Sequence, residues 1–161
     1  MITSSNILSA EHRQALKNIM IEEIEHNLCA LPSAPLYQSY NHMHEKYKNE
    51  TCVSNLINRA LKEAELITNQ KLNILRCWFL VSKKDSVFNF HCHENTYITA
   101  VYFVENCKNH GTIFRVNNSN LQLLCEDNTI ITFDPQIYHT PPDWAGKDRY
   151  SVAIDFKLKT N

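Results

Sequence analysis

The apolar residues of this chain change their spacing near residue 71, and that change limits the folds open to it. Before it, apolar side chains recur at steps of three and four residues, as in an amphipathic helix. After it, they form short runs rich in β-branched and aromatic residues, which are typical of strands. We therefore expect an α+β, mainly β chain, with a helical segment over residues 1–70 and a β core over residues 71–161.

Two helices are predicted in the first part. Ser9 is a suitable N-cap for a helix that runs through Leu28. A second helix is predicted over Thr51–Thr68, where seven apolar residues line one face. The segment Tyr37–Asn49, between the two helices, has no clear periodicity and receives no assignment.

Seven short strands are predicted in the second part, and polar segments separate several of them. Such spacing favours an antiparallel sandwich or barrel with the helices packed on one outer face. The chain has two glycines, which excludes the Gly-rich loops of nucleotide-binding folds. Its length of 161 residues fits a single domain. The predicted strands are Leu72–Val81, Val87–His93, Tyr97–Val104, Thr112–Val116, Leu121–Leu124, Thr129–Phe133 and Tyr150–Leu158.

Charge and hydropathy indicate which kinds of partner and which cellular location to expect for this protein. With 16 Lys and Arg against 17 Asp and Glu, the net charge of -1 argues against a nucleic-acid partner. No apolar run approaches the roughly 20 residues that cross a bilayer, and the polar start of the chain lacks a signal peptide. The six cysteines are scattered singly, as expected for reduced thiols. We expect a cytoplasmic protein.

Three histidines have the arrangement of metal ligands. His91 and His93 are two residues apart in a strand-like run, so both side chains point to the same face. His139 follows the apolar run Thr129–Phe133, and an antiparallel barrel can bring such distant segments together. Imidazole binds Zn, Fe, Cu and Ni well, and three protein ligands leave positions open for other molecules.

The third ligand has two candidates. Iron oxygenases commonly use two His and one carboxylate, which points to Glu94. Strand alternation turns Glu94 away from the face of His91 and favours His93. A His-x-His pair alone is also compatible with ordinary surface or hydrogen-bonded histidines, so further evidence is needed.

That evidence is Arg149-Tyr150-Ser151, ten residues beyond His139. Arg149 and Ser151 lie on one face of a predicted strand. A guanidinium beside a hydroxyl can hold a carboxylate, and a dicarboxylate could reach from this pair to the metal.

These residues, in this order, resemble the 2-oxoglutarate- and iron(II)-dependent oxygenase superfamily, and most of all its small putative 2OG-Fe(II) oxygenases. The resemblance covers roughly Leu72 to Phe156. It implies a double-stranded β-helix, a jelly-roll or cupin-like fold, braced by the N-terminal helices. The matching segments are Arg76–Leu80, His91-Cys92-His93, Ile98–Phe103, Gly111–Phe114, Ile131–Pro135 with His139, and Arg149-Tyr150-Ser151.

The resemblance also implies an activity. Iron(II) would be held by His91, His93 and His139, and the cosubstrate 2-oxoglutarate by Arg149 and Ser151. The expected reaction is hydroxylation of an unactivated C–H bond in a small molecule or peptide, with release of succinate and CO2.

Two alternatives stay open. One is a three-histidine cupin dioxygenase that does not use 2-oxoglutarate, in which Arg149 and Ser151 would have no purpose. The other is a non-catalytic β-sandwich binding module with structural histidines. The N-terminal helices suit pairing of two copies in a homodimer as well as bracing of the β core.

Overall fold

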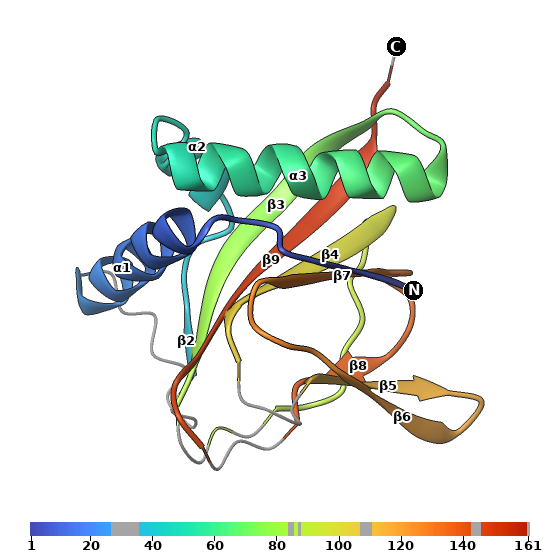
Figure 1. Cartoon of the computed structure of the whole chain (residues 1–161). Coiled ribbons are helices and arrows are strands. Elements are labelled where there is room, and N and C mark those ends of the chain that lie inside the picture. Colours follow the sequence, from blue (N-terminus) through green and yellow to red (C-terminus); the bar gives the residue numbers. More distant parts are fainter. Residues whose placement is uncertain (27–35, 84–85, 87, 107–110, 143–145, 161) are drawn as a thin grey trace.

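The computed structural model describes residues 1–26, 36–83, 86, 88–106, 111–142 and 146–160, which form two antiparallel sheets and three helices (Figure 1). The helices are α1 (Ala10–His26), α2 (Met43–Lys46) and α3 (Thr51–Thr68). The strands are β1 (Ile2–Ser5), β2 (Leu36–Gln38), β3 (Leu72–Ser82), β4 (Ile98–Glu105), β5 (Gly111–Val116), β6 (Ser119–Leu124), β7 (Thr129–Phe133), β8 (His139–Thr140) and β9 (Arg149–Leu158).

The larger sheet has six strands in the order β1-β7-β4-β9-β3-β2, and the smaller has three in the order β6-β5-β8. Every strand pair in both sheets is antiparallel. Strand β9 lies in the middle of the larger sheet between β3 and β4, so its side chains are well placed to be buried on both faces.

The two faces of β9 have different neighbours because side chains alternate along a strand. Val152, Ile154 and Phe156 belong to the main apolar core, together with buried residues of α1 and α3. Figure 1 shows α3 lying across this face of the sheet. Arg149, Ser151, Ala153 and Asp155 alternate with these residues and line a cavity together with Thr112 and His139 of the smaller sheet.

A second, smaller core joins the two sheets. Its buried members are Phe103, Phe114, Cys125, Ile131 and Phe133. Burial of an aromatic or branched side chain of this kind contributes about 1.5–3 kcal/mol. The two sheets are therefore held together by the apolar contacts of this second core.

This architecture confirms the predicted fold class: antiparallel, mainly β, with helices on one outer face. The helix predicted over Thr51–Thr68 is α3, and it ends where Asn69 adopts a left-handed conformation with φ of 51°. Ser9 caps α1 as predicted, since the backbone N–H of His12 donates to its Oγ at 3.2 Å. Helix α1 is described to His26, and the rest of its predicted range lies outside the described residues.

Two sequence-based predictions were incomplete or wrong. Strands β1 and β2 fall in the segment predicted to be helical. They are the two edge strands of the larger sheet. They are four and three residues long, too short to show a periodicity. The described part of the predicted strand Val87–His93 is irregular, with one isolated antiparallel bridge between His91 and His139.

None of the described helices combines the length and apolar character that crossing a membrane requires.

Candidate metal centre

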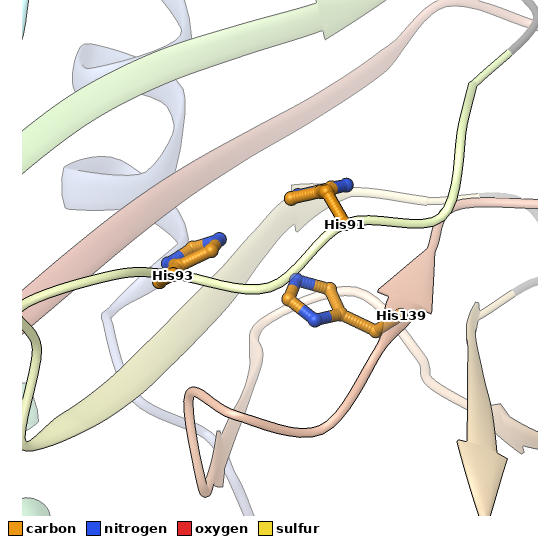
Figure 2. Close-up of side chains that lie close together, drawn as sticks. All are labelled: His91, His93 and His139. Atoms are coloured by element: carbon orange, nitrogen blue, oxygen red, sulfur yellow. The ribbon is translucent and has the colours of Figure 1, made fainter.

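The three predicted histidines converge on one point. His91 and His93 come from the irregular segment between β3 and β4, and His139 begins β8 (Figure 2). Their ring centroids are 4.5 Å apart for His91 and His139, 5.0 Å for His93 and His139, and 5.4 Å for His91 and His93. One ligand atom from each lies within 4.8 Å of the others, which is the arrangement that a shared metal ion needs.

Backbone hydrogen bonds position His91 and His93, which lie outside any strand, against β8 and the turn before it. His91 and His139 exchange two bonds, with N···O distances of 3.0 and 2.9 Å. The backbone N–H of His93 donates to the carbonyl of Pro135 at 2.9 Å. The strand prediction for this segment was therefore wrong in extent, because β8 is two residues long and offers no ladder to pair with. The expectation that His91 and His93 point the same way is still met.

In each ring, Nδ1 faces an oxygen. Nδ1 of His91 lies 3.1 Å from the carbonyl of Asn89, and Nδ1 of His139 lies 2.9 Å from that of Ile137. Nδ1 of His93 lies 2.7 Å from Oδ1 of Asp155. Because carbonyl and carboxylate oxygens only accept, each Nδ1 carries the proton, and each Nε2 keeps a lone pair for a metal.

The pocket also favours the neutral rings that metal binding requires. Burial lowers the pKa of His139 to about 4, and it lowers the pKa of His91 as well. His93 and His139 are buried, whereas His91 lies at the more open side of the cluster. At neutral pH the ring of His139 is therefore neutral, and burial shifts His91 in the same direction.

Glu94, the alternative third ligand, is not part of the cluster. Within the described part of the chain, His91, His93 and His139 are the one group of metal-binding side chains that comes together. Glu94 is exposed, and its backbone carbonyl accepts a hydrogen bond from Arg76 at 3.1 Å. A metal held by this cluster would have three nitrogen ligands, a set that suits a divalent first-row metal such as iron, nickel or zinc.

Arg149 and Ser151 line the same cavity as the histidines. The cavity has a volume of about 450 Å³, within the usual range for small-molecule sites. Arg149 is 3% exposed and Ser151 is 4% exposed, and both lie on the face of β9 that turns toward the metal cluster. The structure therefore brings all five predicted site residues to one cavity.

The guanidinium of Arg149 is buried without an anionic partner. Among the described residues, none accepts a hydrogen bond from it, and its Nε is left unsatisfied. Burial lowers the pKa of Arg149 to about 10, so it still carries its charge at neutral pH. A buried, unpaired cation is costly, which is the pattern expected where a ligand supplies the counter-charge.

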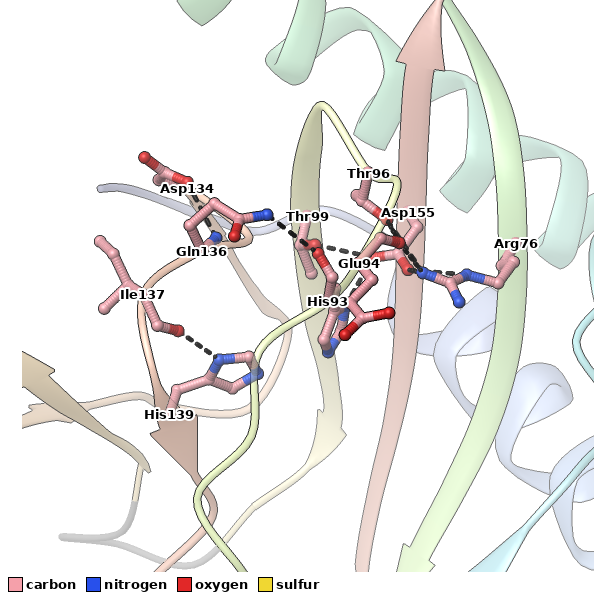
Figure 3. A network of polar contacts seen from close by, with 10 residues as sticks. All are labelled: Arg76, His93, Glu94, Thr96, Thr99, Asp134, Gln136, Ile137, His139 and Asp155. Atoms are coloured by element: carbon pink, nitrogen blue, oxygen red, sulfur yellow. Dashed lines mark hydrogen bonds and ion pairs between the residues drawn. The ribbon is translucent and has the colours of Figure 1, made fainter.

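Asp155 is a site residue that the sequence analysis did not identify. It is fully buried, and the two oxygens of its carboxylate have different neighbours (Figure 3). Oδ1 accepts hydrogen bonds from His93 and from the hydroxyl of Thr99, each at 2.7 Å, and Oδ2 pairs with Arg76 at 2.6 Å. Burial alone raises the pKa of a carboxyl, but these donors lower the pKa of Asp155. Its position four residues after Ser151, on the same face of β9, was the available signal.

No protein-family model matches the chain, and no curated protein matches its sequence. Its fold, in contrast, is that of the 2-oxoglutarate- and iron(II)-dependent oxygenases, the double-stranded β-helix that the sequence resemblance implied. Solved structures of such proteins superpose on almost the whole chain at 10–12% sequence identity.

Three solved structures illustrate the similarity. HygX from Streptomyces hygroscopicus, with nickel and 2-oxoglutarate bound, has a TM-score of 0.73 at 10% identity, covering 98% of this chain and 82% of HygX. An oxidoreductase of the 2OG-Fe(II) oxygenase family from Burkholderia pseudomallei has a TM-score of 0.71 at 12% identity, covering 97% and 83%. A Pseudomonas putida prolyl-4-hydroxylase has a TM-score of 0.69 at 12% identity, covering 99% and 92%.

Proposed function

We propose that this protein is a 2-oxoglutarate- and iron(II)-dependent dioxygenase that hydroxylates an unactivated C–H bond of a small molecule or peptide, releasing succinate and CO2. One observation carries the proposal. The buried, unpaired guanidinium of Arg149 belongs to a residue that lines the same cavity as the three converging imidazoles. A dicarboxylate that chelates a metal with one end and meets a cation with the other satisfies both halves of this arrangement.

In this proposal the histidines bind the metal, and Arg149 and Ser151 bind the cosubstrate. His91, His93 and His139 would hold the iron through their Nε2 atoms, and three protein ligands leave room for a chelating cosubstrate and dioxygen. Arg149 would bind the distal carboxylate of 2-oxoglutarate, with the Ser151 hydroxyl as a second donor. When bound, the iron supplies the activation of dioxygen that no side chain of the chain can provide.

The walls of the cavity keep these interactions strong. Leu80, Val101 and Ala153 add apolar surface to the lining of the cavity that Arg149 and the histidines share. Phe103 covers the guanidinium from the side of the small core. Such walls exclude water, and a carboxylate–guanidinium pair is worth more in a dry site than in solvent.

The three-histidine cupin alternative explains the metal cluster but not Arg149. Without a dicarboxylate, the chain would maintain a buried charge that destabilises it and has no described partner. A non-catalytic sandwich explains neither feature. The solved structure of HygX with nickel, 2-oxoglutarate and hygromycin B supports a small-molecule substrate within this fold.

Anaerobic titration of the Fe(II)-loaded protein with 2-oxoglutarate tests the proposal. We expect a visible metal-to-ligand charge-transfer band that saturates with 2-oxoglutarate and is lost in Arg149→Ala. Arg59→Ala, which removes an exposed arginine of α3 that pairs with Glu63, is the matched control and should keep the band. Iron binding without a band in the wild type would favour the cupin alternative, and failure to bind iron would favour the binding module.

The proposal also includes a cytoplasmic location and a homodimer. The four described cysteines, Cys52, Cys77, Cys92 and Cys125, are free thiols, consistent with the expected reducing cytoplasm. Homodimer formation through the helices stays a prediction, which size-exclusion chromatography with light scattering would test.

A further inference from the structure

Among the described residues, no carboxylate joins the histidine cluster, although iron oxygenases commonly place one among their metal ligands. Three imidazoles leave the positive charge of a divalent ion uncompensated by the protein, whereas a two-histidine, one-carboxylate set reduces it by one. The buried anion nearest in the hydrogen-bond network is Asp155, bonded to Nδ1 of His93 at 2.7 Å. A negative charge is thus present beside the cluster, but on a residue that contacts a histidine and not on a fourth side chain of the cluster itself.

The strand register builds this arrangement across the sheet. Asp155 of β9 is directly opposite Thr99 of β4 on one side and Arg76 of β3 on the other. In β3 the register shifts between Ile74 and Arg76, and this irregularity is what brings Arg76, rather than Leu75, opposite Asp155. A donor therefore lies on each side of the carboxylate, and both donors are held by strands rather than by loops.

The two carboxylate oxygens of Asp155 have different hydrogen-bond partners. Arg76 contacts Oδ2 through both Nε, at 3.0 Å, and a terminal nitrogen, at 2.6 Å. Oδ1 is shared by His93 and the Thr99 hydroxyl. Arg76 offsets the cost of burying the charge, and Oδ1 stays available to His93 (Figure 3).

We propose that Asp155 is a positioning residue that holds His93 in the Nδ1-protonated tautomer and makes its Nε2 a stronger, partly anionic metal ligand. His93 and Asp155 together then take the place of the carboxylate ligand. A hydrogen-bonded carboxylate is known to fix the orientation of a ligating histidine and to raise its basicity. The inference rests on the proposed metal site and specifies how a three-histidine set is electrically balanced.

Two variants separate charge from hydrogen bonding. Asp155→Asn keeps the shape and an oxygen acceptor for Nδ1 but removes the charge, and Asp155→Leu removes both. Ni(II) affinity, measured by calorimetric titration, should fall about 10- to 100-fold in Asp155→Asn, the range typical for loss of such a partner. It should fall further in Asp155→Leu. No turnover is needed for this measurement.

A spectroscopic readout adds a test that a purely structural role would not pass. With the charge removed, the iron becomes poorer in electrons, so the Fe(II)–2-oxoglutarate charge-transfer band of Asp155→Asn should move to shorter wavelength. In the Zn(II)-loaded wild type, ¹⁵N-edited NMR of the histidine rings should show His93 protonated at Nδ1, a signature that Asp155→Leu should lose.

Thr99→Val is the matched control. It removes the hydroxyl that donates to Oδ1 and lies 3.2 Å from Nδ1 of His93, while the carboxylate and its charge remain, so its Ni(II) affinity should stay within a few-fold of the wild type. If Asp155→Asn binds Ni(II) as tightly as Thr99→Val does, or its band does not move, the inference is wrong although the metal site stands. If the wild type itself binds no metal, the proposed function fails with it.

Discussion

The guanidinium of Arg149 lies over the ring of Phe103, with its central carbon 4.9 Å from the ring centroid. The two residues come from neighbouring strands, β9 and β4, and both are buried. Phe103 gives the cation a favourable surface but no counter-charge. The contact therefore holds the side chain in place at the wall of the cavity while its Nε stays without a partner, as a site prepared for an anion would require.

Replacing this arginine should stabilise the empty protein. In Arg149→Met the buried, unpaired charge is exchanged for an apolar side chain of similar length, and we expect the metal-free protein to gain about 1–4 kcal/mol in free energy of unfolding. Urea denaturation checks this. Arg59→Met, at an exposed arginine of α3, should change the free energy of unfolding by less than about 0.5 kcal/mol. Destabilisation in Arg149→Met would mean that the charge already has a partner.

Removing the hydroxyl of Ser151 should weaken the cosubstrate and spare the metal. A hydrogen bond to a charged group is worth about 1.5–3 kcal/mol, so Ser151→Ala should raise the apparent 2-oxoglutarate dissociation constant by about tenfold or more. The charge-transfer titration measures this constant, and Ni(II) calorimetry without 2-oxoglutarate serves as the control. An unchanged dissociation constant would exclude Ser151 from the carboxylate site.

The identity of the third metal ligand is tested by a pair of neighbouring substitutions. His93→Ala removes a ring from the cluster and should abolish stoichiometric Ni(II) binding. Glu94→Ala alters an exposed side chain outside the cluster and should leave the Ni(II) affinity unchanged. Weak binding in Glu94→Ala together with retained binding in His93→Ala would reverse the assignment.

Gly111 is required by a close approach within the β5–β6 hairpin. A Cβ at this position would lie 1.5 Å from the carbonyl oxygen of Leu123, so the backbone must move in Gly111→Ala. We expect a loss of about 1–3 kcal/mol in free energy of unfolding, as for other overpacked sites. Hydrogen exchange should show faster amide exchange across the hairpin.

The matched substitution for this hairpin is Ser119→Ala at its exposed end, which should change the free energy of unfolding by less than about 0.5 kcal/mol. Equal stability of Gly111→Ala and the wild type would show that the hairpin is not packed as the structure has it.

Much of the fold and part of the site were predictable from local patterns. The spacing of apolar residues predicts α3 because a helix repeats every few residues, and the alternation along β9 predicts that Arg149 and Ser151 share a face. The short strands β1 and β2 were not predictable, since pairing with β7 and β3 defines them and their own sequences do not.

The candidate site divides in the same way. The residue types and their order along the chain already point to His91, His93, His139 and Arg149, because the i, i+2 geometry and ligand chemistry are local properties. The contacts of Asp155 with Arg76 and Thr99, in contrast, depend on the register of β3, β4 and β9. Residues as far apart in the chain as Arg76 and Asp155 meet only after the sheet has formed, so their contact depends on tertiary structure alone.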